Sequence, residues 1–265
     1  MAAWNKVKFF WDNIFGIAGG TLTATSTATG YDVANIHNGL EVNSWKATST
    51  AAQRIDIDTF SADTSADSLL IGAGHNLVGA TISLWKSTTG AWAGEQVAVV
   101  SGFVAAAGLI LKEFTQTTSR YWALYVNGTI IVIPEIQIAM LCNKTELDYA
   151  STSFDPHAQD VVSDINISAG GFVSGIFTRY TERSMQLSFI DVSTPDGWDA
   201  DATNVYYKLS AWYEGNGMKQ FVVAWENANR PTDVFLMRWD GKRNNAMSKG
   251  GAFRDIDIKL KGRKV

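Results

Sequence analysis

The sequence has little of what disulfide-stapled, metal-binding or membrane-spanning proteins need. Cys142 is its one cysteine, so neither an internal disulfide nor a cysteine-based metal site can form. The histidines are isolated, without a second histidine or an acidic residue at ligand spacing, so we expect no metal and no cofactor. No apolar run approaches the roughly 20 residues of a membrane span. The N-terminus mimics a signal peptide, but Asp12 and Asn13 break its apolar run, and we interpret it as structure.

Catalytic motifs are missing as well. The sequence has no G-x-S-x-G elbow, no H-E-x-x-H and no phosphate loop ending in G-K-[ST]. A glycosidase needs only two carboxylates at a set separation, which five acidic residues could supply in principle: Glu41, Glu95, Glu113, Glu135 and Asp148. We expect the protein not to be an enzyme.

Positive charge is also scarce. The formal net charge is −4, which argues against nucleic acid as the main partner because phosphate contacts need concentrated Lys and Arg. The segment 241–265 is the exception, with eight basic residues against Asp255 and Asp257. A solvated strand that contacts an acidic neighbour is the simpler interpretation, and a nucleic-acid contact is the alternative.

Aromatic residues, by contrast, are abundant. With 10 Trp, 13 Phe and 8 Tyr but only 18% charged residues, the composition indicates a surface that partners cover in part. The first 19 residues form a predicted N-terminal arm that is too rich in aromatics for one short helix face to bury. We therefore expect it to make assembly contacts through these residues: Trp4, Phe9, Phe10, Trp11, Ile14 and Phe15.

Short alternating or apolar runs bounded by Gly, Ser, Thr and Asn fill the first half of the chain. They predict eight strands near residues 21–27, 53–60, 68–74, 80–87, 95–103, 108–115, 120–126 and 135–141. In RIDID, Ile55 and Ile57 point one way and the charged residues the other, so this strand has one wet face. We predict an eight-stranded jelly-roll β-sandwich over 20–142.

The pattern changes after residue 142. A polar stretch, 143–160, reads as a linker or an extended arm. Beyond it, 161–265 is predicted to be a β-rich domain with one short amphipathic helix, on which Val205, Leu209 and Trp212 share a face. The fold class is therefore mainly all-β.

Five segments in order resemble a known family: YDVANIHNG, NSWKATSTAAQRIDID, SLLIGAGHNLVGATISLW, FTQTTSRYWALYV and EIQIAML. They are similar to the discoidin or coagulation-factor-type-C family of galactose-binding-like jelly rolls, most closely to a version found in phage and prophage tail proteins. KQFVVAWENANRPTDVFLMRWDG resembles the C-terminal part of those tail proteins. In one loop the sequence departs from the family, because His37-Asn38-Gly39-Leu40 lacks the usual aspartate, which puts any calcium site of that loop in doubt.

The resemblance implies structural roles for several residues. Trp45 corresponds to a core tryptophan of the family, although exposed Trp rings also serve as sugar-stacking platforms. Arg120 corresponds to a half-buried arginine that pairs locally, with ligand contact as the alternative, and Trp122 belongs to the core of the same strand. The candidate glycan-binding residues lie at strand ends in the resembling fold: Asn38, Asn43, Lys46, His75 and Asn76.

For His75 and Asn76 a loop-fixing hydrogen bond is the simpler alternative to ligand contact. A second loop, DVSTPDGWDAD, places Asp196, Asp199 and Asp201 close together and either binds calcium or is a solvated turn.

Taken with the resemblance, the sequence predicts a structural component of a tailed-bacteriophage virion, at the tail tip, baseplate or fibre attachment. Such a protein is made in the host cytoplasm and located in the virion tail. Its expected partners are other tail proteins and further copies of itself in a ring or complex. The alternative is a carbohydrate-binding adhesion module that recognises a host surface glycan.

Overall fold

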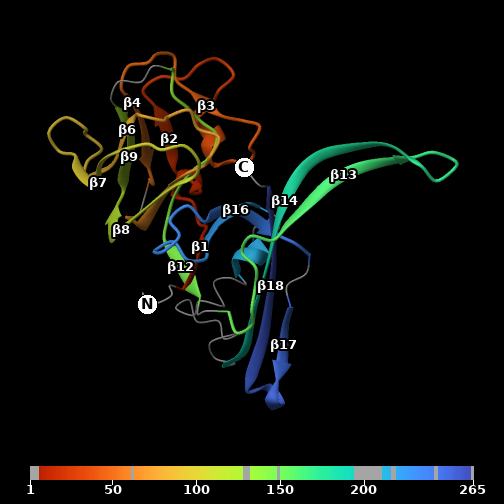
Figure 1. Cartoon of the computed structure of the whole chain (residues 1–265). Coiled ribbons are helices and arrows are strands. Elements are labelled where there is room, and N and C mark those ends of the chain that lie inside the picture. The colour runs from red at the N-terminus through yellow and green to blue at the C-terminus, as the bar shows by residue number, and fades with distance from the viewer. Residues whose placement is uncertain are drawn as a thin grey trace. The chain divides into compact units, whose positions relative to one another are not determined.

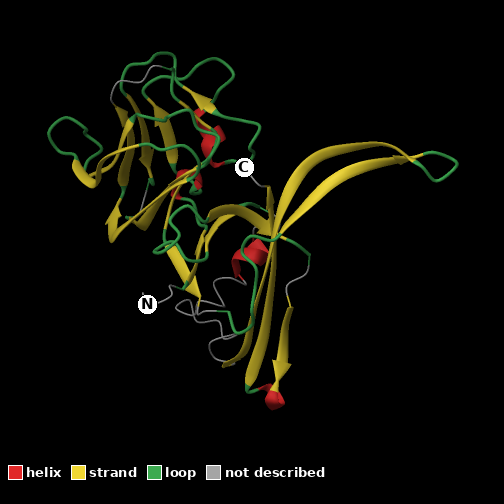
Figure 2. Ribbon diagram, viewed as in Figure 1, coloured by secondary structure: helices red, strands yellow, loops and turns green. Residues whose placement is uncertain are grey.

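The computed structural model describes residues 6–60, 63–127, 132–147, 150–193, 211–215, 219–241 and 244–263. Strands dominate throughout and the helical segments are short (Figure 2), which confirms the all-β prediction. The chain divides into two compact units, one of residues 10–144 and one that joins the N-terminal residues up to Phe9 to residues 145–265.

The first unit is a β-sandwich. Its larger sheet has five antiparallel strands in the order β2 (Thr21–Ala24), β4 (Gln53–Asp58), β9 (Tyr121–Asn127), β6 (Thr81–Ser87) and β7 (Val97–Val104). The smaller sheet has the order β11 (Ala139–Cys142), β5 (Thr64–Ile71) and β8 (Ile110–Ser119). A short pair, β3 (Trp45–Lys46) with β10 (Glu135–Ile136), and two 3-10 turns, η1 (Ile14–Gly16) and η2 (Val33–His37), complete the unit. Each of the eight predicted strands overlaps a strand of the structure.

Alternation fixes which side chains enter the core. Along β4, Gln53, Ile55 and Ile57 are buried while Arg54, Asp56 and Asp58 are half-buried, the period of two expected of a strand with one wet face. Isoleucines of β4 join a continuous apolar cluster with residues of both sheets, among them Leu69, Leu84 and Leu124. Trp45 lies inside this cluster with no exposed surface, and its indole N–H donates to the carbonyl of Ser26 over 3.2 Å.

The second unit is built on one eight-stranded sheet. Its order is β12 (Lys144–Leu147), β1 (Val7–Phe10), β15 (Phe221–Ala224), β16 (Val234–Trp239), β18 (Phe253–Arg263), β14 (Val173–Ser193) and β13 (Gln159–Ile167), with β17 (Asn244–Ser248) also paired to β18. A 3-10 turn, η3 (Lys249–Gly251), connects β17 to β18. Residues 211–215 are helical, and Trp212 of this helix packs on Phe221 with ring centroids 4.8 Å apart. Val205 and Leu209, the other two residues of the predicted helix face, lie outside the described residues.

The expected N-terminal arm is not a separate exposed element, and this prediction is wrong. Residues 7–10 form a strand between β12 and β15, and Phe9 packs on Phe221 with ring centroids 5.9 Å apart. Ile14 and Phe15 belong instead to the core of the sandwich. The aromatic residues are divided between the cores of the two units, so no single helix face has to bury all of them. Phe10 and Trp11 are also buried, whereas Trp4 lies outside the described residues.

From residue 145 onward the predicted linker also belongs to the second unit. It contains β12, and its later residues run along β14: the N–H of Ser151 donates to the carbonyl of Ser188, and the N–H of Ser184 to the carbonyl of Ala158. The basic C-terminal segment contacts acidic neighbours of the same chain, since Lys261 lies 3.3 Å from Glu182 and Lys249 pairs with Asp191.

We predict that Trp45→Ala lowers the free energy of unfolding by about 3–5 kcal/mol, because it leaves a large cavity in the sandwich core. Urea denaturation followed by circular dichroism measures the change. Val42→Ala, at a side chain 89% exposed three residues away, is the matched control and should change stability by less than about 0.5 kcal/mol. A Trp45→Ala variant as stable as the control would contradict this placement.

Candidate functional site: the loop end and the outward face of the sandwich

The predicted glycan loops meet at one end of the sandwich, around Glu135. Lys46 Nζ lies 3.4 Å from one carboxylate oxygen of Glu135, and the Ser44 hydroxyl donates to the other over 2.7 Å. The Lys46 ammonium also lies 5.4 Å from the centroid of the Tyr31 ring. This end therefore has an acidic residue and a partly exposed ring, neither of which was among the predicted site residues.

Two of the predicted residues are turned inward. The imidazole of His75 accepts at Nδ1 from the N–H of Leu77, so its Nε2 carries the proton and donates to the carbonyl of Gly108, each over 3.0 Å. Burial lowers the pKa of His75. The Asn76 amide bridges the carbonyl of Ile133 and the N–H of Glu135. Both side chains thus hold loops in place, as in the simpler alternative.

Asn38 and Asn43 lie in the exposed loop that follows η2. The Asn38 side chain accepts from the N–H of Leu40, and the backbone N–H of Asn43 donates to the carbonyl of Leu40. Ligand contact by Asn38, Asn43 and Lys46 stays a prediction.

A second polar surface covers the outward side of β2, β4, β9 and β6, four of the five strands of the larger sheet. The pairing register aligns Thr23, Asp56, Ala123 and Trp85 in one row across β2, β4, β9 and β6. A neighbouring row contains Thr21, Asp58, Tyr121 and Ser87, and another contains Arg54, Tyr125 and Ser83. We call these eleven side chains the outward face. Among the outward residues of these four strands, no aliphatic side chain is larger than alanine.

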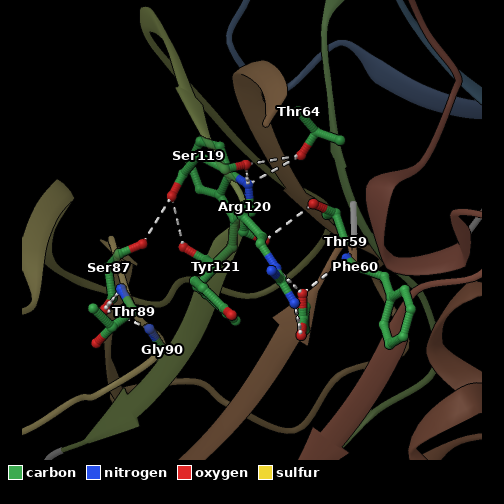
Figure 3. Close-up of polar contacts among 11 residues, drawn as sticks. Thr59, Phe60, Thr64, Ser87, Thr89, Gly90, Ser119, Arg120 and Tyr121 are labelled. Atoms are coloured by element: carbon green, nitrogen blue, oxygen red, sulfur yellow. Dashed lines mark hydrogen bonds and ion pairs between the residues drawn. The ribbon is translucent and has the colours of Figure 1, made fainter. Parts of the chain in front are cut away.

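Two arginine–aspartate forks order the carboxylates of this face. Arg54 donates to both oxygens of Asp56 over 2.6 and 3.0 Å. Arg120, at the turn between β8 and β9, donates to both oxygens of Asp58 over 2.7 and 3.0 Å, and this hydrogen bonding lowers the pKa of Asp58 (Figure 3). A bidentate pair of this kind holds both partners in one orientation while leaving further lone pairs on the oxygens.

Aromatic rings lie between and beside the forks. Trp85 and Tyr125 stack with centroids 4.3 Å apart and an interplanar angle of 20°. The Arg120 guanidinium lies 4.7 Å from the Tyr121 ring centroid, and that of Arg54 lies 5.4 Å from the ring of Trp92. All four rings are partly exposed. Because each has a fixed neighbour, it can offer its face to a ligand with little loss of side-chain entropy.

The loop after β6 closes one corner of the outward face, and Glu95 anchors it. The hydroxyls of Ser87, Thr88 and Thr89 all donate to the Glu95 carboxylate, and they lower its pKa to about 2. Gly90 packs so closely on Tyr121 that an added Cβ would lie 3.0 Å from the ring, and its φ of +82° also favours glycine (Figure 3).

Beside this loop lies a hollow of about 280 Å³. Its walls carry charged groups of both signs, Lys86, Arg120, Asp63 and Glu95, together with hydroxyls of Thr118 and Ser119. The Lys86 ammonium donates to the hydroxyl of Thr117 over 2.7 Å. The hollow therefore lies at the start of β9, where the end of β8 meets the end of β6.

Other residues that the sequence analysis singled out make contacts within the protein. Trp122 is fully buried, and its indole N–H donates to the carbonyl of Ser119. Of the carboxylates that could supply a glycosidase pair, Glu95 and Glu135 are held as described above, and Glu113 pairs with Lys144 over 3.2 Å. Asp148 lies outside the described residues.

The candidate calcium loop with Asp196, Asp199 and Asp201 also lies outside the described residues. In the described part of the chain, no three His, Cys, Asp or Glu side chains gather as a metal site would require. None of the helices described there has the length and apolarity to cross a membrane.

The sequence analysis identified three of the eleven residues of the outward face, those of β4. The alternation in RIDID predicts a wet face for Arg54, Asp56 and Asp58, but it does not indicate that this face recognises a ligand. The same parity in RYWALYV puts Tyr121 and Tyr125 opposite the buried Trp122 and Leu124, a signal that was available. The pairing of β4 with β9 and of β9 with β6 was not available, because these contacts join residues far apart in the sequence.

Comparisons with known proteins give fold-level likenesses only. No family model matches the sequence, and no curated protein matches it. A chitosan-binding module of a Paenibacillus sp. IK-5 chitosanase/glucanase is 13% identical with a TM-score of 0.42, and the match covers 49% of this chain and 98% of the module. The Clostridium perfringens module CpGH89CBM32-5, solved with GalNAc-β-1,3-galactose, is 14% identical with a TM-score of 0.39, covering 46% and 94%.

A Ruminococcus gnavus GH29 fucosidase is 16% identical with a TM-score of 0.44, and the match covers 51% of this chain but only 27% of the enzyme. The function of the present chain therefore has to follow from its own side chains.

We predict that the Glu95 carboxylate stabilises its loop in a pH-dependent way. Its pKa is about 2 in the folded chain against an ordinary 4.5, so the contribution is fully present above pH 4.5 and is lost as the pH falls toward 2. The melting temperature of the wild type should therefore exceed that of Glu95→Gln at pH 7, and the gap should close toward pH 2. A gap that is the same at both pH values would contradict this role.

Proposed function

We propose that the sandwich unit is a carbohydrate-binding module and that the outward face is its binding platform. One observation supports this most: two arginine–aspartate forks, hydroxyl groups and partly exposed aromatic rings share a face that lacks larger aliphatic side chains. The proposed role is binding without catalysis.

The chemistry of this face matches that of a sugar. A pyranose ring presents C–H groups on its faces and hydroxyls around its edge, so it needs flat rings to stack on and directional hydrogen-bonding groups beside them. Trp85 and Tyr125 would supply the rings. Asp56 and Asp58 can accept further hydrogen bonds from hydroxyls while the arginines hold them in position.

Charge and shape narrow the ligand class. The two arginines and two aspartates of the forks balance, so this part of the face favours neutral sugars over strongly anionic ones. The recognition groups are spread over several rows and four strands of the sheet. An extended saccharide chain fits that layout better than a single monosaccharide.

Assembly is the second candidate function, and a specific observation favours it. The hairpin of β13 and β14 exposes large apolar side chains such as Ile165, Ile176 and Phe177, each more than half exposed. We propose that the chain belongs to a particle of repeated subunits, in which a binding module and an assembly unit serve together. The particular particle, a tailed-phage virion with other tail proteins as partners, rests on the sequence resemblance alone.

The binding proposal predicts that the full chain is retained on at least one neutral polysaccharide of a plant, fungal or bacterial cell-wall panel. Trp85→Ala and Tyr125→Ala should each weaken that binding about tenfold, or about 1.4 kcal/mol, through loss of the stacking surface. Affinity electrophoresis with the soluble polysaccharides, followed by calorimetry, measures the effect.

Lys46→Ala is the matched control, because it alters the loop end and leaves the outward face unchanged. It should bind like the wild type. Binding that Lys46→Ala abolishes and Trp85→Ala spares would move the site to the loop end. Absence of binding to the whole panel would contradict the proposal.

A further inference from the structure

The outer part of the β13–β14 hairpin is a two-stranded ribbon without further support in the sheet. β14 pairs with β18 only from Glu182 onward, so in the described chain β13 and the part of β14 before Glu182 pair with each other or with the rest of β14, and with no third strand. In Figure 1 this ribbon, which we define as residues 159–181, extends away from the rest of its own sheet. An isolated two-stranded hairpin is marginally stable at best in water.

Large apolar side chains occupy one face of the ribbon. Directly paired residues share a face, which places Ile165 with Ile176 and Ile167 with Val173, and the alternation of β13 adds Val161. Each of these five side chains is 55–67% exposed. We call this face one.

The opposite face carries aromatic residues. Phe177 pairs with Asp164, and Tyr180 pairs with Val162, on the side of β13 that face one does not use. Phe177 is 66% exposed and Tyr180 is 45% exposed. We call this face two. Its one described ion pair lies within the ribbon, between Asp164 and Arg179 at 2.7 Å, so the ribbon has little net charge to offer a charged partner.

The exposed apolar area is divided between the two faces. With roughly 100 Å² exposed on each side chain, face one presents on the order of 500 Å² and face two on the order of 200 Å². Face one packed on face two would therefore remove about 700 Å² of apolar surface from water, which places the contact at the small end of specific interfaces before polar atoms are counted. Face one alone is as large as the largest apolar patch of a typical monomer, which is often functional.

We propose that the ribbon is an assembly element that packs between the ribbons of two other copies of this chain, face one of each copy on face two of the next. A symmetric dimer would bury the same face on both partners and leave the other exposed. Head-to-tail packing of identical chains covers both faces and generates a closed ring or an open stack. This inference is independent of carbohydrate binding and gives the assembly function its partner, a second copy of the chain.

Two variants disrupt the two faces of the ribbon one at a time. Ile165→Lys/Ile176→Glu removes the apolar centre of face one while keeping a favourable cross-strand pair that holds the ribbon together. Phe177→Lys removes the ring of face two and sits opposite Asp164, which compensates its charge. Val78→Ser is the control, since it changes a 62% exposed apolar side chain of the sandwich.

Native mass spectrometry and light scattering on the full chain test the proposal. We expect the wild type and the control to form a species larger than a dimer, and each face variant alone to be monomeric. An equimolar mixture of the two face variants should form a heterodimer, because one intact face one meets one intact face two.

Three results would overturn the proposal. A monomeric wild type would show that a different protein covers the ribbon. A face-two variant that still dimerises while the face-one variant does not would indicate a symmetric dimer. A large species that survives both variants would place the interface elsewhere. Retention of the variants on the polysaccharide that the wild type binds confirms that they are folded and keeps this test separate from that of the platform.

Discussion

Burial of every second side chain along β4, β9 and β6 is the constraint on which the sandwich unit depends. Ile55, Ile57, Trp122 and Leu124 have at most 2% of their surface exposed, and the indole of Trp122 is tied to the carbonyl of Ser119. A shift of one residue in register would send these side chains to water and bury the aspartates and tyrosines, at a cost far above that of any single contact. The same packing that makes the core therefore sets the composition of the outward face.

The polar groups of that face are largely organised before any ligand arrives. Each aspartate is held by an arginine fork, the rings of Trp85 and Tyr125 support each other, and Glu95 fixes the adjacent loop through three hydroxyls. Preorganisation reduces the entropy lost on binding, so even shallow contacts of this kind can give useful affinity. The loop end around Glu135 differs, because His75 and Asn76 already use their hydrogen-bonding groups inside the protein.

Sequence reasoning succeeded where the signal is local and failed where it depends on distant neighbours. The strands and the wet face of β4 follow from alternation over a few residues, which any strand with one buried side must show. The placement of Phe9 and Phe15 does not follow from any local pattern. Phe9 lies in β1, which enters a sheet made of residues more than 130 positions away, whereas Phe15 joins the core of the sandwich. The sequence predicted a β-rich domain over 161–265, but only the register shows that residues 159–181 have no third strand beside them in the described chain.

The claim that the outward face is a carbohydrate platform is tested most directly by NMR on the indole N–H groups during titration with a soluble polysaccharide that the chain binds. The tryptophans of the sandwich divide into two sets. Trp85 of the outward face and Trp92 beside Arg54 are partly exposed, whereas Trp11, Trp45 and Trp122 are buried. The account predicts that the signals of Trp85 and Trp92 shift progressively while those of Trp45 and Trp122 stay in place. Saturable binding that leaves Trp85 and Trp92 unshifted would contradict it.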